Sequence, residues 1–183
     1  MTDPAQLAEL VEEWPHDAKS RELVLMLLRH TPAPYYRQQY TPGHITATAC
    51  VLHPDGGRFL LVHHKRLDRW LFPGGHVEAE DDVIWDTACR EAVEETGVLL
   101  ALQTPLLTGI DVHGIPCRKQ EPYHLHHDLI FRFRAQSPEL MVTEETRAVV
   151  WCSPAEFERY DLPPSIRECV ERSIIKHSFK QRL

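Results

Sequence analysis

Three glutamates stand within five positions in the segment REAVEETG, at Glu91, Glu94 and Glu95. At about 100° per residue, a helix would align them along one edge, next to an apolar stripe that begins at Trp85. Like charges at this spacing oppose helix formation by a few tenths of a kcal/mol per pair. Hard divalent cations such as Mg²⁺ take oxygen ligands and share them with phosphate groups. The cluster therefore indicates a divalent-metal site, with a charged surface helix as the alternative interpretation.

The residues on either side of the glutamates favour the metal site. The preceding stretch WLFPGGHVEAED contains Gly74 and Gly75, whose backbone can approach an anion closely. Gly97 follows the cluster, at the position where helices often end in a left-handed residue. The pattern predicts a glycine-broken loop and then a helix from about residue 82 to 96.

The string from Gly75 onward resembles the signature of the Nudix hydrolases. That signature has a glycine, five residues, a glutamate, seven residues, and then Arg-Glu, two residues, Glu-Glu, one residue and glycine. From Arg90 to Gly97 this sequence matches it, but the first half departs, because Asp82 stands eight positions before Arg90 and six residues separate it from Gly75. Either Asp82 takes the role of the first acid, or Asp81 does so and keeps the glycine spacing. We expect Asp82 to pair with Arg90 or with a metal-bound water, and Asp81 to cap the helix.

The resemblance implies hydrolysis of a diphosphate bond, in a nucleoside diphosphate linked to another group or in a nucleoside triphosphate. It implies Mg²⁺ or Mn²⁺ as the cofactor, held by Gly75 through its carbonyl and by Asp82, Glu91, Glu94 and Glu95. By the same resemblance the catalytic residues are Glu94, Glu91 and Arg90. A glutamate would activate water, and the planar guanidinium would orient the carboxylates. The alternative is a Nudix-fold sensor that binds a nucleotide without hydrolysing it, and the intact glutamates speak against this alternative.

Four further residues are candidates for binding the substrate: Arg66, Trp70, His126 and Asp128. Arg66 belongs to a small basic cluster, and Trp70 could stack on a base or pack in the core. Period two places His126 and Asp128 on the polar face of a strand. We expect that face to border the substrate pocket, on the same side of the sheet as Glu95.

Two alternatives concern residues near these candidates. His124 and His126 could instead bind a transition metal, because imidazole is a common ligand of such ions. Glu144 and Glu145, in TEETRAVVW, could lie on a loop near the pocket and supply a distal acid.

The remaining patterns predict the elements that position these residues. Residues 3–30 show two amphipathic helices, followed by a proline-rich connector. Strand patterns follow, with a hairpin at 44–52 and 58–65 joined by the turn HPDGG, and further strands near 106–113, 125–134 and 148–153. SPAEFERY predicts a short helix, and an amphipathic helix closes the chain. The order predicts an α/β fold: a Nudix-type mixed sheet sandwiched between helices, with an N-terminal helical extension at 1–43 and the main domain at 44–177.

Composition restricts the class of partner. The formal charge of −7 over 183 residues argues against an extended nucleic acid, so we expect a small phosphorylated substrate. Five scattered cysteines form no disulfide or zinc pattern, and no stretch is apolar enough for a membrane span. The sequence lacks the order of a signal peptide, which predicts a cytoplasmic protein. The N-terminal helices offer an interface for a homodimer.

Overall fold

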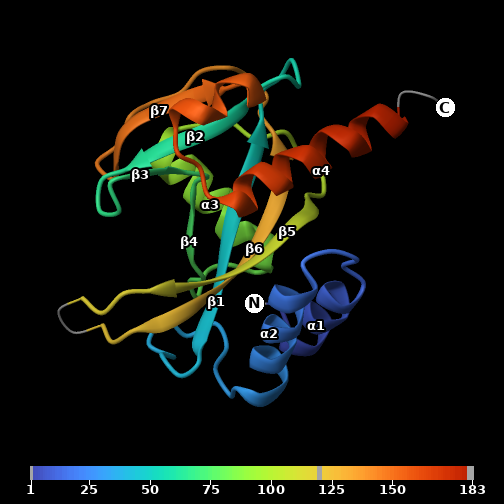
Figure 1. Cartoon of the computed structure of the whole chain (residues 1–183), viewed down its shortest axis with the longest axis vertical. Helices are drawn as coiled ribbons and strands as arrows, with labels where there is room; N and C mark the ends of the chain where they lie inside the picture. Colours follow the sequence, from blue (N-terminus) through green and yellow to red (C-terminus); the bar gives the residue numbers. More distant parts are fainter. Residues whose placement is uncertain (1, 119–120, 181–183) are drawn as a thin grey trace.

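The computed structural model describes residues 2–118 and 121–180 (Figure 1). In chain order the elements are α1 Pro4–Glu12, α2 Ala18–His30, β1 Gly43–Leu52, β2 Phe59–His64, β3 Arg69–Leu71, β4 Gly74–His76, α3 Ile84–Thr96, β5 Leu106–Ile115, β6 His124–Arg134, β7 Thr146–Cys152, the 3₁₀ helix η1 Pro154–Arg159 and α4 Pro164–Lys180. The order agrees with the prediction except at β3 and β4, where a loop was expected. The glycines of β4 have low strand propensity, and backbone pairing to β1 holds them in the sheet nevertheless.

The sheet is mixed, as predicted. Its main path runs β3-β2-β1-β6-β5, with β4 paired to β1 and β7 paired to β2. The long pairing of β1 with β6 is parallel, and the other named pairs are antiparallel. β1 is central because β6 follows one of its edges, while β2 and β4 share the other edge at opposite ends. The predicted hairpin of β1 and β2 is present, with Leu52 opposite Phe59.

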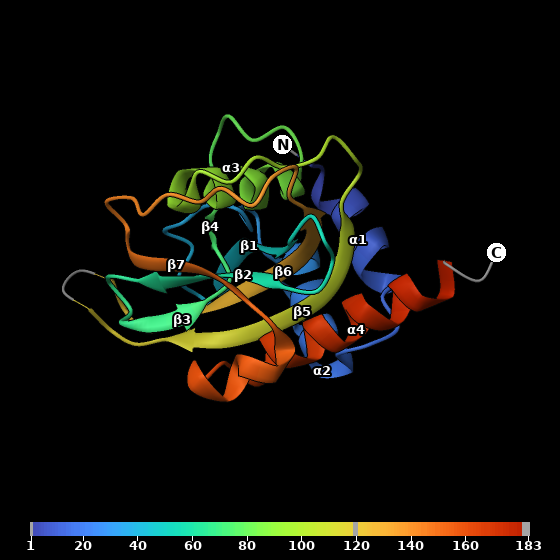
Figure 2. The same cartoon turned by 90° about the horizontal axis from the view of Figure 1, so that it is seen from above.

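Helices cover both faces of the sheet, with α3 on one side and α4 on the other (Figure 2). Phe131 of β6 faces α3 and contacts Trp85, with ring centroids 6.2 Å apart. The next residue back, Ile130, belongs instead to the apolar cluster that contains Cys169 and Val170 of α4. Because successive strand residues point to opposite faces, odd positions of β6 face α3 and even positions face α4.

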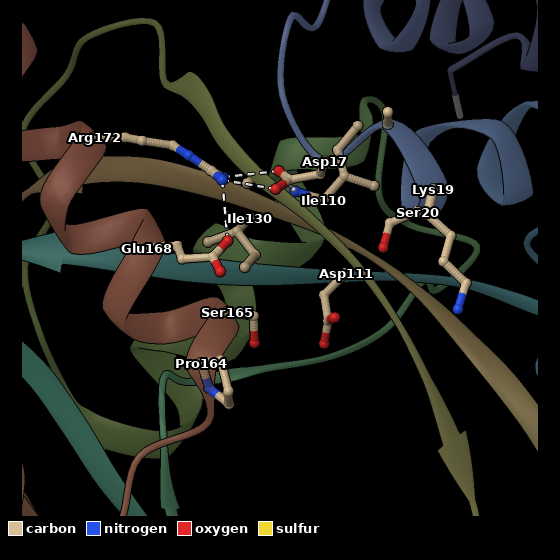
Figure 3. Close-up of a pocket in the computed structure, with 12 residues that line it drawn as sticks. Asp17, Lys19, Ser20, Ile110, Asp111, Ile130, Pro164, Ser165, Glu168 and Arg172 are labelled. Atoms are coloured by element: carbon tan, nitrogen blue, oxygen red, sulfur yellow. Dashed lines mark hydrogen bonds and ion pairs between the residues drawn. The ribbon is translucent and has the colours of Figure 1, made fainter.

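The N-terminal helices pack on the main domain. Buried side chains of α1 and α2 share one apolar cluster with Ile45 of β1 and Ala92 of α3. The turn between the two helices is also tied to α4, because Arg172 donates from both terminal nitrogens to the two carboxylate oxygens of Asp17, each at 2.7 Å (Figure 3). A cavity of about 300 Å³ lies beside this ion pair, and none of its lining residues comes from α3 or β4.

The ends of α3 agree only partly with the prediction. The helix begins at Ile84, two residues later than expected, and its N-cap residue is Val83. It ends as predicted, with Gly97 in the left-handed region at φ 65° and its N–H bonded to the carbonyl of Val93. In the described part of the chain, none of the helices combines the length and the apolarity that crossing a bilayer would require.

Candidate functional site

The glutamates of α3 form a graded series from solvent to core. The side chain of Glu94 is 54 % exposed and that of Glu91 14 %, while Glu95 is 1 % exposed. An apolar face on the same helix explains this order, since Ala88 and Ala92 are fully buried against the sheet. A ligand that enters from solvent can therefore meet Glu94 first and then contact the buried carboxylate of Glu95.

Two glycines let β4 pack closely against its neighbours, Gly75 against α3 and Gly74 against β1. A Cβ atom on Gly75 would overlap the Glu91 carboxylate, and one on Gly74 would lie too close to the carbonyl of Ala47. Any side chain at either position would push the helix or the strand away. The contact brings together Glu91 and Gly75, two of the groups predicted to bind metal.

Arg90 connects the acidic residues, as predicted from the sequence. Its Nη1 donates to Glu91 at 3.0 Å and to Glu94 at 3.2 Å, and its Nη2 donates to the carbonyl of His76 at 2.8 Å. A rigid planar guanidinium with several donors fixes the directions of the carboxylates it touches. Arg90 thereby links α3 to the end of β4.

The aspartate that pairs with Arg90 is Asp81, so the prediction of Asp82 for this role was wrong. Arg90 donates to both carboxylate oxygens of Asp81, from Nε and Nη2, each at 3.2 Å. The hydroxyl of Thr87 and the N–H of Glu78 donate to the same carboxylate at 2.7 and 2.9 Å. Asp81 is 4 % exposed, whereas Asp82 is exposed to solvent.

The late start of α3 explains the error. Counting back from Arg90 assumes that the helix extends to residue 82, but it begins at Ile84, after a turn in which the N–H of Asp81 bonds to the carbonyl of Glu78. Asp81 therefore does not cap the helix either. Burial alone would raise the pKa of the Asp81 carboxyl, but its bonds to Arg90, Glu78 and Thr87 together hold that pKa below the ordinary value.

The surroundings of Glu95 disfavour the charged form of its carboxyl group. Burial, together with the charges of Glu91 and Glu145, raises its pKa to about 8, and the N–H of Gly74 opposes this rise. Its Oε2 atom is buried and has no hydrogen-bond partner in the described structure. Burial also raises the pKa of Glu91, although Arg90 opposes it. Oxygens that lack a counter-charge at this depth fit a hard divalent cation, which would satisfy the orphaned atom and the charge together.

Glu145 lies near these glutamates and was only an alternative in the sequence. The hydroxyls of Thr143 and Thr146 donate to the carbonyl of Glu95 at 3.2 and 3.3 Å, which ties the loop to the last turn of α3. The negative charge of Glu145 raises the pKa of both Glu91 and Glu95. Hydroxyl residues on either side of an acidic pair were the signal in the sequence, but only the fold could show where the loop is attached.

His126 and Asp128 lie on the other face of the sheet, so the prediction that they border a pocket beside Glu95 was wrong. Both occupy even positions of β6, on the face that packs against α4. Asp128 accepts hydrogen bonds there from the hydroxyls of Thr46 and Thr48 at 2.9 and 3.0 Å. The period-two pattern was correct, but α3 is itself amphipathic and must cover the apolar face of the sheet.

The other two predicted substrate residues also have partners within the protein. Arg66 forms an ion pair with Glu121, with Nη2 and Oε2 3.0 Å apart. Trp70 packs edge-on against Tyr160, with ring centroids 4.9 Å apart, in the apolar cluster on the α4 side. Substrate binding by Arg66 or Trp70 stays a prediction.

Several known proteins share the family model or the fold of this chain. Residues 43–173 match the family model described as NUDIX domain. A hydrolase of the NUDIX family from Clostridium perfringens superposes with a TM-score of 0.56 at 19 % identity, over 72 % of this chain and 97 % of that one. An Ap4A hydrolase from C. elegans, in a binary complex, gives 0.52 at 16 % identity, over 76 % and 98 %. The NUDIX domain of Shewanella oneidensis NrtR, complexed with ADP ribose, gives 0.53 at 17 % identity, over 88 % and 98 %. No protein of curated function matches the chain.

Proposed function

Because the chain belongs to the Nudix family, with a match that spans residues 43–173, we propose that it hydrolyses a diphosphate bond with the help of a divalent cation. The resemblance seen in the sequence is thereby confirmed at the level of the family. One observation carries the proposal for this chain: the buried Glu95 has a carboxyl oxygen without a partner, in a position next to Glu91.

The residues that would hold Mg²⁺ or Mn²⁺ are Glu91, Glu94 and Glu95, together with the carbonyl of Gly75. When bound, the cation neutralises charge on the diphosphate and makes its phosphorus more electrophilic. Arg90 keeps Glu91 and Glu94 in fixed directions through its hydrogen bonds to both. We do not assign a ligand role to Asp82, because its side chain is exposed and Asp81 makes the contact with Arg90.

Two acids are candidates for accepting the proton of the attacking water. Glu94 is half exposed, so its carboxylate can meet both solvent and a substrate that enters from solvent. Glu145 lies on the loop anchored to the end of α3, and its charge acts on both Glu91 and Glu95. We propose Glu94 as the general base and Glu145 as the second candidate, and kinetics on Glu94→Gln and Glu145→Gln would rank them.

The proposed substrate is a small nucleotide derivative with a diphosphate linkage. The C. elegans relative is a hydrolase of Ap4A, and the NrtR domain was seen with ADP ribose, so this fold accommodates ligands of that chemistry. In a chain with a net charge of −7, a cation bound at the glutamates would reverse the local negative field, so that a polyphosphate could approach them.

The test is a panel of nucleoside triphosphates, dinucleotides and nucleotide sugars, assayed for phosphate and pyrophosphate release with Mg²⁺ and with Mn²⁺. Glu95→Gln should lower kcat on the best substrate by 10²-fold or more, about 2.7 kcal/mol at the transition state, because it removes a charged ligand. The matched control is Glu13→Gln, which removes one carboxylate from the exposed end of α1. Tight binding of one compound without turnover of any would overturn the proposal and favour a sensor.

Glu95→Gln should stay folded, which makes the assay interpretable. The raised pKa of Glu95 means that, without a cation, the protein holds the neutral carboxyl more readily than the charged one. A neutral amide of the same shape should therefore be tolerated. Urea unfolding in the presence of a chelator would verify this, and the variant should be at least as stable as the wild type at pH 8.

A further inference from the structure

Histidine side chains gather on the α4 side of the sheet, near the start of β1. The rings of His44, His124 and His126 lie close together, with centroids 5.1 Å apart for His44 and His124, 4.9 Å for His44 and His126, and 5.3 Å for His124 and His126. The parallel pairing of β1 with β6 explains the contact, since His44 stands directly opposite His126 in the register. The ring centroid of His76 in β4 lies 5.1 Å from the ring centroids of both His44 and His126.

Hydrogen bonds fix the tautomer of two of these rings. Nδ1 of His44 lies 3.2 Å from the carbonyl of Gln39, and Nδ1 of His124 lies 2.8 Å from the carbonyl of Pro122. A carbonyl only accepts, so each Nδ1 carries the proton and each Nε2 keeps a free lone pair. His44 is 0 % exposed, and its Nε2 has no hydrogen-bond partner in the described structure.

We propose that His44, His124 and His126 form a second metal site, which binds a divalent transition metal of the zinc class through three imidazole nitrogens. One nitrogen from each residue lies within 4.8 Å of the other two. Imidazole suits zinc and its neighbours, whereas Mg²⁺ prefers oxygen. Backbone carbonyls that hold the remote nitrogen of a ligating histidine are typical of metal sites, because they fix the tautomer and the ring direction.

The site needs only small movements to close on an ion. Zinc binds imidazole nitrogen at roughly 2.0–2.1 Å, so tetrahedral ligands stand about 3.4 Å from one another. Side-chain rotation can supply the remaining ångström or so, because the ligands come from the paired strands β1 and β6, which need not move. The fourth coordination position would be filled by a water molecule or by His76, whose ring contacts those of His44 and His126.

The surroundings favour a cation ligand over an anion. Nε2 of His44 and of His124 keeps a lone pair, because the Nδ1 atom of each ring donates to a backbone carbonyl. A lone pair can bind a metal cation but cannot donate a hydrogen bond to an anion. A phosphate group, in contrast, would need protonated rings. The neighbouring guanidinium of Arg66 is already paired with Glu121.

This proposal does not depend on the diphosphate hydrolase, because the two sites use opposite faces of the sheet and different donor atoms. The test uses the full-length protein, stripped with a chelator, dialysed and supplied with excess Mg²⁺. Co²⁺ is then titrated and its visible absorption recorded, followed by competition with Zn²⁺. One equivalent of Co²⁺ should bind with the intense bands of a low-coordinate nitrogen site, and Zn²⁺ should displace it.

Variants connect this signal to the histidines. His126→Gln should weaken binding of Co²⁺ and Zn²⁺ by tenfold or more, which is the loss that removing even a supporting contact to a metal ligand commonly causes. The matched control is His30→Gln, which removes one exposed imidazole from the end of α2, and its affinity should be unchanged. Glu95→Gln should also bind as the wild type does. His124→Gln provides the same test if circular dichroism shows that His126→Gln is misfolded.

Three results would overturn the proposal. The first is that wild-type protein gives no Co²⁺ signal at stoichiometric concentrations. The second is that His126→Gln binds as tightly as the wild type while Glu95→Gln loses binding, which would place the ion at the carboxylates. The third is that inorganic phosphate, and not Zn²⁺, shifts the imidazole resonances of the metal-free protein, which would make the cluster an anion site.

Discussion

Replacing Asp81 by asparagine should destabilise the protein far more than the same change at Asp82. Asp81 is buried and accepts four hydrogen bonds, two of them from Arg90. Asparagine offers one acceptor oxygen, so its amide group would face a donor of Arg90, Thr87 or Glu78. Breaking a buried ion pair by removing one partner costs about 3–5 kcal/mol.

The lower end of that range applies here. Arg90 keeps Glu91, Glu94 and the carbonyl of His76 as partners, so the guanidinium is not left without a counter-charge. We therefore expect Asp81→Asn to lose about 3 kcal/mol of unfolding free energy. Asp82→Asn, at an exposed position, should stay within roughly 0.5 kcal/mol of the wild type.

Urea unfolding of the two variants and the wild type at pH 7 and one ionic strength measures the difference. Kinetics with Mg²⁺ complete the comparison, because a displaced Arg90 should also lower kcat of Asp81→Asn while Asp82→Asn keeps the wild-type value. Equal stability of the two variants, or a larger loss for Asp82→Asn, would refute the role of Asp81 as the residue that positions Arg90.

Three further changes probe other contacts of the fold. Asp17→Asn should cost about 2 kcal/mol of unfolding free energy at pH 7, because the carboxylate pairs with Arg172. Burial would raise the pKa of Asp17, but its hydrogen bonds hold that pKa below the ordinary value. The loss measured by urea unfolding should therefore be full above about pH 4 and shrink as the pH falls through the folded-state pKa. Gly75→Ala should displace Glu91 and lower both divalent-ion affinity and kcat, with a stability loss of about 1–3 kcal/mol; unchanged Mn²⁺ affinity would contradict it. Leu27→Ala should lower the unfolding free energy by about 2–5 kcal/mol, because the side chain is buried in the shared core. Calorimetry on the folded variant should show that its Mn²⁺ affinity is unchanged.

Local patterns were sufficient to predict the helix that carries the glutamates and the order of the main elements. The segment from Arg90 to Gly97 contains its own signals, with periodic apolar residues and a glycine that ends the helix. The start of α3 could not be predicted in the same way, because nothing in EAEDDVIWD distinguishes a helix residue from the turn before it. Asp81 and Asp82 differ by one position, and the backbone turn at Glu78 decides which of them enters the core.

Contacts between distant residues could not be predicted in the same way. His44 and His126 are 82 positions apart, and no local pattern specifies the parallel pairing that brings them together. The face of β6 that α3 would cover was also not given by the strand itself, since alternation defines two faces without saying which one is the site. The sequence therefore predicted the correct grouping of His126 with Asp128 and the wrong side for both.

The pairing of β4 with β1 shows how one short strand can serve two different chemistries. Gly75 stands opposite Ala47 and faces α3, where the absence of a side chain admits the Glu91 carboxylate. His76, one residue later, stands opposite Thr46 and faces the other side, where its ring joins the histidines. A shift of one residue in this register would place an imidazole against the glutamates and a glycine among the histidines. The backbone pairing of three residues therefore keeps an oxygen-lined face and a nitrogen-lined face apart.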